Sequence, residues 1–139
     1  MKLAKYKETL SGPLRQATLC FLIKEKEILL ARKKRGFAEG KINGVGGKVV
    51  DGESVEDAAK RETQEEIEVI VKSLRKVAII DFYFPHNPDW EQQVVVFIVD
   101  QWEGNPKETD EMAPTWYPIE NIPYHLMWAD DIHWLPKVL

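Results

Sequence analysis

Cysteine is nearly absent from this sequence, and long hydrophobic runs are absent altogether. Cys20 is the only cysteine among the 139 residues, so the chain cannot form an internal disulfide. It lies in the apolar run 19–23, where a small buried thiol is the expected state. No segment approaches the roughly 20 apolar residues needed to cross a bilayer, and residues 1–12 lack the apolar stretch of a signal peptide. We therefore expect a cytoplasmic protein with no membrane partner.

An excess of positive charge is also missing. The chain has 19 Lys and Arg against 23 Asp and Glu, a formal net charge of −4. Domains that bind nucleic-acid polymers usually carry a positive field, so we expect no such partner. An anionic small molecule would need a local site or a metal ion. The length and the 44% hydrophobic share fit one globular unit, and we expect residues 1–139 to form a single domain.

Hydrophobic patterning predicts strands that alternate with helices. Two short apolar runs separated by 24–26 read as a hairpin, and Ser54 with Asp57 is typical of a helix start. The predicted strands cover 18–23, 27–32, a short stretch near 48–50, 71–84 and 92–100, and the predicted helices cover 54–69 and a segment near 130–135. This order predicts an α+β fold with a mixed β-sheet between helices.

The helix predicted over 54–69 carries acids on the side that should face the core. On a helical wheel, Glu62 and Glu66 share an arc with the small apolar residues, Glu65 lies at its edge, and Arg61 lies on the solvated side. Glu62 and Glu66 repel each other, and burial of an uncompensated carboxylate is costly. Magnesium would neutralise such a group, because it prefers hard oxygen ligands. The alternative is a solvated acidic face in which Arg61 pairs with Glu65, and the helix alone does not decide.

The residues before and along this helix follow a known pattern. Gly47 is followed by five residues, Glu53, seven residues and then the segment 61–66, which reads RETQEE. This resembles the Nudix signature G-x5-E-x7-R-E-U-x-E-E-x-G-U. Six fixed residue types at this spacing would arise by chance in roughly one chain in 10⁵ of this length. The resemblance implies the Nudix fold, an α/β/α sandwich, and magnesium-dependent hydrolysis of a diphosphate linkage in a nucleotide.

One position departs from the signature. Glu68 stands where the family has a second glycine. That glycine usually ends the helix, so we expect the helix to run on or to end differently here. Glu68 lies on the solvated side of the wheel, and we expect no effect on the metal ligands.

The resemblance extends over residues 18–136 and is strongest to Nudix members that act on oxidised purine nucleoside triphosphates. The matching stretches are 33–37, 43–44, 46–49, 110–112 and 127–131. It implies hydrolysis of substrates such as 8-oxo-dGTP to the monophosphate and pyrophosphate, which would sanitise the nucleotide pool. Two alternatives stay open: a Nudix hydrolase of another nucleotide, such as a dinucleotide polyphosphate or ADP-ribose, and a non-catalytic nucleotide-binding module.

Residue by residue, the resemblance implies three overlapping sets of site residues. Arg61, Glu62, Glu65 and Glu66 would be catalytic, with Glu65 or Glu66 as general base and Arg61 orienting a carboxylate. The implied ligands of Mg²⁺, or of Mn²⁺, are Gly46 through its carbonyl, Glu62, Glu65, Glu66 and Glu111. The implied substrate-binding residues are Thr18, Lys33, Phe37, Asn43, Gly46, Gly47, Lys48, Phe82, Trp128, Asp130 and Asp131. For Glu111, a solvated acid is the alternative.

The chemistry of these side chains suits a purine. Trp128 offers an aromatic face and Asn43 offers a donor and an acceptor. Asp130 and Asp131 would not both be ionised if they were buried together, so one would keep its proton, and the pair could then read a purine edge. The alternatives are that these acids cap the following helix and that Trp128 only packs in the core.

Overall fold

The computed structural model describes residues 14–36, 39–83, 86 and 91–139. Its chain begins with the predicted hairpin, formed by β1 (Arg15–Lys24) and β2 (Glu27–Lys33). The two strands pair antiparallel with Ile23 opposite Ile28. Glu25 turns the chain with a φ of 57°, a left-handed conformation that matches the twist of tight hairpins.

The hairpin belongs to a six-stranded mixed sheet, which confirms the predicted fold class. The strand order is β3-β2-β1-β5-β4, and β6 pairs with β2. β1 runs parallel to β5, from Arg15 opposite Gln92 to Leu22 opposite Val99, whereas β4 and β5 are antiparallel. The remaining strands are β3 (Ile42–Asn43), β4 (Ile70–Phe82), β5 (Gln92–Glu103) and β6 (Met112–Pro118).

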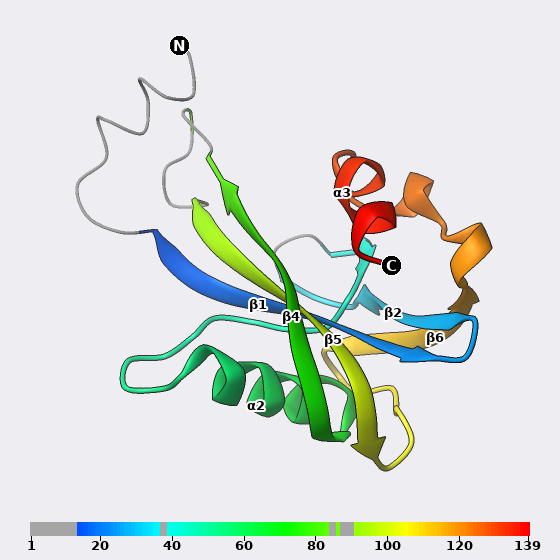
Figure 1. Cartoon of the computed structure of the whole chain (residues 1–139), viewed down its shortest axis with the longest axis horizontal. Helices are drawn as coiled ribbons and strands as arrows, with labels where there is room; N and C mark the ends of the chain where they lie inside the picture. The colour runs from blue at the N-terminus through cyan, green and yellow to red at the C-terminus, as the bar shows by residue number, and fades with distance from the viewer. Residues whose placement is uncertain (1–13, 37–38, 84–85, 87–90) are drawn as a thin grey trace.

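Helices cover both faces of this sheet (Figure 1). α2 (Val55–Ile67) lies against one face, where Leu22 packs in a cluster with Ala59. α3 (Asp131–Val138) covers the other face, where Phe21 packs in a cluster with Leu135, beside the 3₁₀ turns Ile119–Asn121 and Tyr124–Leu126. Phe21 and Leu22 alternate between the faces and are fully buried, and each such side chain contributes about 1.5–3 kcal/mol by leaving water.

α2 begins as predicted and ends where the sequence analysis did not expect. The Ser54 hydroxyl accepts a hydrogen bond from the Asp57 amide at 3.1 Å. Glu68 adopts the left-handed conformation, with φ 58° and ψ 40°, and its N–H donates to the Gln64 carbonyl at 2.9 Å. The expectation that the helix would run on or end differently is therefore wrong, because Glu68 takes the conformation that glycine usually supplies.

The predicted short strand near 48–50 is also wrong. Lys48 forms only an isolated bridge to Ala17, and the short strand is β3, which the sequence analysis missed. The segment through Gly46 crosses β1 closely, with the Thr18 amide donating to the Gly47 carbonyl at 2.8 Å. This segment is held to β1 by single backbone hydrogen bonds and not by a continuous strand pairing.

Two further expectations concern what the chain lacks. Cys20 is buried, and burial raises the pKa of its thiol to about 12, so it behaves as the expected inert core residue. Within the part of the chain that the structure describes, no helix is long and apolar enough to span a bilayer.

Candidate active site

Arg61 lies at the centre of the charged groups on α2. Its Nε and Nη2 donate to the two carboxylate oxygens of Glu53 at 2.8 and 3.0 Å. Its Nη1 donates to Glu62 at 2.8 Å and to Glu65 at 3.2 Å, and Nη2 also reaches the Lys48 carbonyl at 3.0 Å. The guanidinium holds the pKa of Glu53 below its usual value. Arg61 thus fixes the loop before the helix and the helix carboxylates relative to one another.

Glu66 is the buried acid of the helix. It is 7% exposed, and one carboxylate oxygen accepts a hydrogen bond from the Gly46 amide at 2.7 Å. Burial raises its pKa to about 7, the Gly46 hydrogen bond opposes that rise, and the charges of Glu62 and Glu111 add to it while Lys33 lowers it. Burial and the neighbouring negative charges disfavour the ionised form of Glu66, and a bound cation would stabilise that form.

Exposure separates the helix acids and corrects part of the sequence prediction. Glu66 is buried and the Glu62 side chain is 18% exposed, so both face the protein body as predicted. Glu65 does not, because its side chain is 58% exposed. Arg61, predicted on the solvated side, is half-buried because its long side chain folds back over the loop to reach Glu53.

Two glycines let this loop pass between β1 and α2. A Cβ atom on Gly46 would lie 2.0 Å from the Thr18 carbonyl oxygen, and one on Gly47 would lie 2.3 Å from the carboxylate carbon of Glu62. Both distances are far below van der Waals contact, so a side chain at Gly46 would collide with the β1 backbone and one at Gly47 would displace the Glu62 carboxylate. The consequence is that a main-chain segment lies directly against the helix carboxylates.

Glu111 comes from the loop before β6. Its carboxylate accepts a hydrogen bond from Arg35 Nε at 3.1 Å and contacts Nη2 of the same side chain, and this pairing lowers the pKa of Glu111. The Thr109 hydroxyl donates to the Glu66 carbonyl at 2.7 Å and accepts from the Glu111 amide at 3.3 Å. Thr109 therefore ties the Glu111 loop to the end of α2.

The oxygen atoms gathered here are of the kind that binds a hard cation, although most of the carboxylates are hydrogen-bonded to arginine side chains. Among the described residues, no three acidic, His or Cys side chains converge closely enough to hold a metal ion as they stand. Glu62 and Glu65 face Arg61. Glu111 faces Arg35. Carboxylates beside an exposed loop carbonyl are nevertheless the oxygen ligands that Mg²⁺ prefers, and the buried acid next to them would gain from a positive charge.

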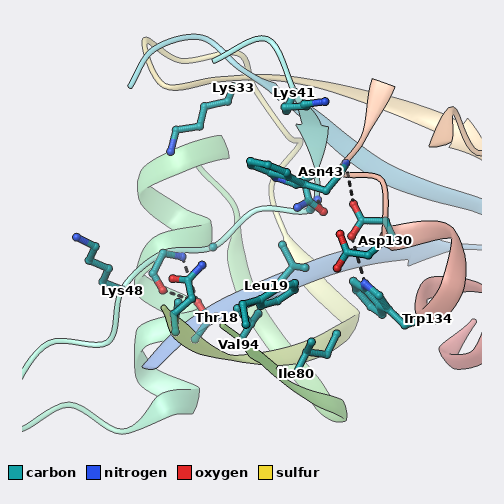
Figure 2. A pocket seen from close by; sticks show the side chains of 18 of the residues that line it. Thr18, Leu19, Lys33, Lys41, Asn43, Lys48, Ile80, Val94, Asp130 and Trp134 are labelled. Atoms are coloured by element: carbon teal, nitrogen blue, oxygen red, sulfur yellow. Dashed lines mark hydrogen bonds between the residues drawn. The ribbon is translucent and has the colours of Figure 1, made fainter. Parts of the chain in front are cut away.

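A pocket of about 630 Å³ lies beside these acids, between the sheet and α3. Its volume is in the range of small-molecule sites. Figure 2 shows Leu19, Val94 and Ile80 on one side of the pocket and Lys41 with Asn43 across from them. Asp130 and Trp134, at the start and within α3, close a third side. The pocket thus combines an apolar floor with polar walls.

The two aspartates differ sharply in exposure, so they are not buried together. Asp130 is exposed, whereas Asp131 is 3% exposed. Asp131 accepts hydrogen bonds from the Trp128 amide and the Trp134 indole, both at 3.2 Å. Burial, and then the Asp130 charge, raise the pKa of Asp131 to about 6. Asp130 makes no side-chain capping bond to α3, and it lines the pocket.

Asn43 and Trp128 each have a neighbour that fixes them. The Asn43 side-chain oxygen accepts from the Gly44 amide at 2.8 Å, which leaves the NH₂ group to point elsewhere. The Lys41 ammonium lies 5.6 Å from the centroid of the Trp128 ring, a favourable cation–π distance. Sequence reasoning missed Lys41, although residues two apart on an extended chain share a face and Asn43 was identified.

The pocket brings together every predicted substrate-binding residue except Phe37, which lies outside the described residues. These residues are Thr18, Lys33, Asn43, Gly46, Gly47, Lys48, Phe82, Trp128, Asp130 and Asp131. Their assignment as substrate contacts stays a prediction. Sequence reasoning also missed Gln92 and Trp134, which line the same pocket. Trp134 follows Asp131 by three residues, one helical turn, and that spacing could have identified it.

Comparisons with known proteins found a matching family, similar sequences and a similar fold. A family model for the NUDIX domain matches residues 13–138. The chain is 46% identical over 122 residues to an oxidized purine nucleoside triphosphate hydrolase from Danio rerio, a match that covers 88% of this chain and 78% of that protein. It is 43% identical over 122 residues to the protein of the same description from Mus musculus, with the same coverage. Among solved structures, the fold is similar to a MutT NUDIX hydrolase from Burkholderia pseudomallei, with a TM-score of 0.80, 26% identity, and coverage of 92% of this chain and 100% of that one.

Proposed function

Because this chain belongs to the Nudix family of hydrolases, we propose that it hydrolyses oxidised purine nucleoside triphosphates such as 8-oxo-dGTP to the nucleoside monophosphate and pyrophosphate. The proposed cofactor is Mg²⁺, with Mn²⁺ as a substitute, and the proposed partner is a small nucleotide. The two relatives with 43–46% identity are described as oxidized purine nucleoside triphosphate hydrolases.

One observation supports the proposal most strongly. The pocket runs from an apolar floor and the Trp128 wall to Gly46 and Gly47, and the carboxylates of Glu62 and Glu66 lie against those two glycines. A purine on the apolar side would therefore direct its phosphates toward the acidic helix. Lys33 and Lys48, which also line the pocket, add positive charge for a triphosphate.

The residues of the chain have distinct tasks in the proposed reaction. Water attacks one phosphorus atom of the phosphoanhydride bond between the α- and β-phosphates, that bond breaks, and the bridging oxygen stays with the other product. The cation, held by the Gly46 carbonyl, Glu62, Glu65, Glu66 and Glu111, would neutralise the phosphate oxygens and acidify bound water. Glu65 or Glu66 accepts the proton from the attacking water. Arg61 positions these carboxylates through the hydrogen bonds described above.

The test is pyrophosphate release from 8-oxo-dGTP, 2-oxo-dATP and dGTP, each with magnesium and with a chelator. We expect magnesium-dependent release that favours an oxidised purine. The Glu66→Gln variant should lose about 10²- to 10⁴-fold in kcat, and Glu56→Gln, on the exposed first turn of the same helix, serves as the control.

Two results would change the proposal. Magnesium-dependent hydrolysis of dinucleotide polyphosphates or ADP-ribose, without turnover of oxidised purines, would keep the hydrolase and reject the substrate. A lack of turnover of any diphosphate would favour a nucleotide-binding module.

A further inference from the structure

The floor of the pocket is an apolar surface with one polar residue in it. Three strands supply the floor: β1 gives Ala17 and Leu19, β4 gives Ile80 and Phe82, and β5 gives Val94 and Gln92. The register places Val94 beside Ile80 and Gln92 beside Phe82. Side chains directly opposite each other on paired strands share a face, so Gln92 extends the same surface with a primary amide.

Gln92 differs from its neighbour Gln93 in how its amide is used. Both residues are half-buried, but they point to opposite faces of the strand. The Gln93 NH₂ group donates to Asp81 at 3.1 Å, and its oxygen accepts from Gln16 at 3.0 Å. Among the described residues, the Gln92 amide has no hydrogen-bond partner. A polar group that shares an apolar floor loses water when a ligand enters, and this costs binding energy unless the ligand bonds to it.

Oxidised purines offer a matching edge. Oxidation at C8 replaces a ring-nitrogen acceptor and an adjacent C–H by an N–H donor beside a C=O acceptor. A glutamine amide carries the complementary pair, a C=O acceptor and NH₂ donors, and can bond to both atoms at once. An unmodified purine cannot offer this pair at that edge, so its entry leaves part of the amide unsatisfied. Such unpaired polar groups are an effective basis for rejection of a substrate.

We infer that Gln92 is a specificity-determining residue that reads the N–H/C=O edge created by purine oxidation. The inference rests on the proposed function and adds a residue to it. Asn43 and Asp130 lie on other walls of the pocket and can contact the remaining polar edge of the base. Gln92 would then discriminate oxidised from unmodified purines. Contacts to the remaining edge cannot do so, because that edge is the same in both.

The test compares Gln92→Met with Gln93→Met, which changes the same side chain on the opposite face of the same strand. For Gln92→Met we expect kcat/KM for 8-oxo-dGTP to fall about 3- to 10-fold, the value of one or two hydrogen bonds, while kcat/KM for dGTP does not fall, because the amide that it left unsatisfied is gone. Gln93→Met should leave both values unchanged.

Binding of 8-oxo-dGMP and dGMP, measured by calorimetry in the presence of a chelator, separates this inference from the proposed reaction. If the wild type binds 8-oxo-dGMP more tightly than dGMP, and Gln92→Met reduces that preference about 3- to 10-fold, the inference stands even if no substrate is hydrolysed. Equal losses for both nucleotides, or an unchanged preference in a variant that unfolds at the wild-type temperature, would overturn it.

Discussion

At the scale of single residues, Arg61 and Asp131 show how one side chain organises several others. Arg61 reaches two oxygens of Glu53 together with Glu62 and Glu65, and a planar guanidinium is the only side chain with enough donors in a fixed fork. Asp131 receives two N–H groups in a site that is nearly closed to water. Both residues act mainly on their protein neighbours.

Replacement of Arg61 by lysine should therefore impair the site although the charge is kept. A lysine ammonium cannot hold both oxygens of Glu53 and also reach the helix acids, so the helix carboxylates lose their fixed positions. We expect kcat/KM for the preferred triphosphate to fall about 10- to 100-fold, with weaker binding of Mn²⁺. Steady-state pyrophosphate release and a Mn²⁺ titration measure the two effects. Lys60→Arg, at the exposed neighbouring position, is the control, and full activity of Arg61→Lys would contradict the positioning role.

The titration of Asp131 predicts a pH-dependent contribution to stability. Its pKa rises from 3.8 to about 6 in the folded protein, so between these values the folded state holds the proton more tightly than the unfolded chain does. The contribution to stability is full below about pH 4 and is lost as the pH rises through about 6. Relative to the wild type, Asp131→Asn should gain roughly 3 kcal/mol in free energy of unfolding between pH 4 and pH 8. Urea unfolding across this range measures the gain, and a constant difference between the two proteins would argue against it.

At the scale of elements, interactions at the two ends of α2 fix the position of this acidic helix. Its start is capped by Ser54, and the Glu111 loop bonds to its end through Thr109. The last turn closes on Glu68, a residue with a Cβ in a left-handed conformation. Such a residue is strained, because its Cβ crowds the following carbonyl.

Glu68→Gly should relieve this strain. We expect an increase of about 1 kcal/mol in the free energy of unfolding, equivalent to a rise in Tm of about 2–4 °C for a chain of this size. Glu68→Ala removes the carboxylate and keeps the Cβ, so it should gain little. Thermal unfolding of both variants tests the explanation, which equal Tm values for the two would refute.

The sequence predicts elements well wherever the signal is local. The β1–β2 hairpin and the start of α2 follow from alternation and a cap within a few residues. β3 was missed because it is only two residues long, too short for an alternation of apolar and polar side chains to be visible in the sequence. The different burial of Asp130 and Asp131 depends on how α3 packs on the sheet, and the pattern of residues does not contain that information.

In the site, too, residues with a local sequence signal were predicted and residues that depend on the tertiary structure were not. The signature places the acids on α2, and the resemblance supplies the pocket residues, which the structure gathers around one cavity. Gln92 escaped notice because its role depends on the register that sets it beside Phe82. Lys41 escaped notice because Trp128, its aromatic neighbour, lies far along the chain.

At the scale of the whole molecule, the acids of the site oppose folding until a cation arrives. Glu66 is buried near the charges of Glu62 and Glu111, and burial of charge is costly. Magnesium at about 100 times its dissociation constant should add about 2.7 kcal/mol to the free energy of unfolding, a rise in Tm of about 5–10 °C. In a chelator at pH 8, Glu66→Gln should unfold at a higher temperature than the wild type and should respond less to magnesium. Calorimetry of both proteins with and without magnesium measures these changes in Tm. An equal rise in Tm on addition of the metal would count against Glu66 as a ligand.

The parallel pairing of β1 with β5 has a consequence for synthesis of the chain. It joins residues 77 positions apart, and pairing over such a separation slows folding because a long loop must close first. A ribosome will have released the hairpin and α2 long before β5 emerges. The edge of β1 that pairs with β5 therefore stays open during translation, which makes the nascent chain, and not the finished enzyme, the form most exposed to aggregation and most dependent on chaperones.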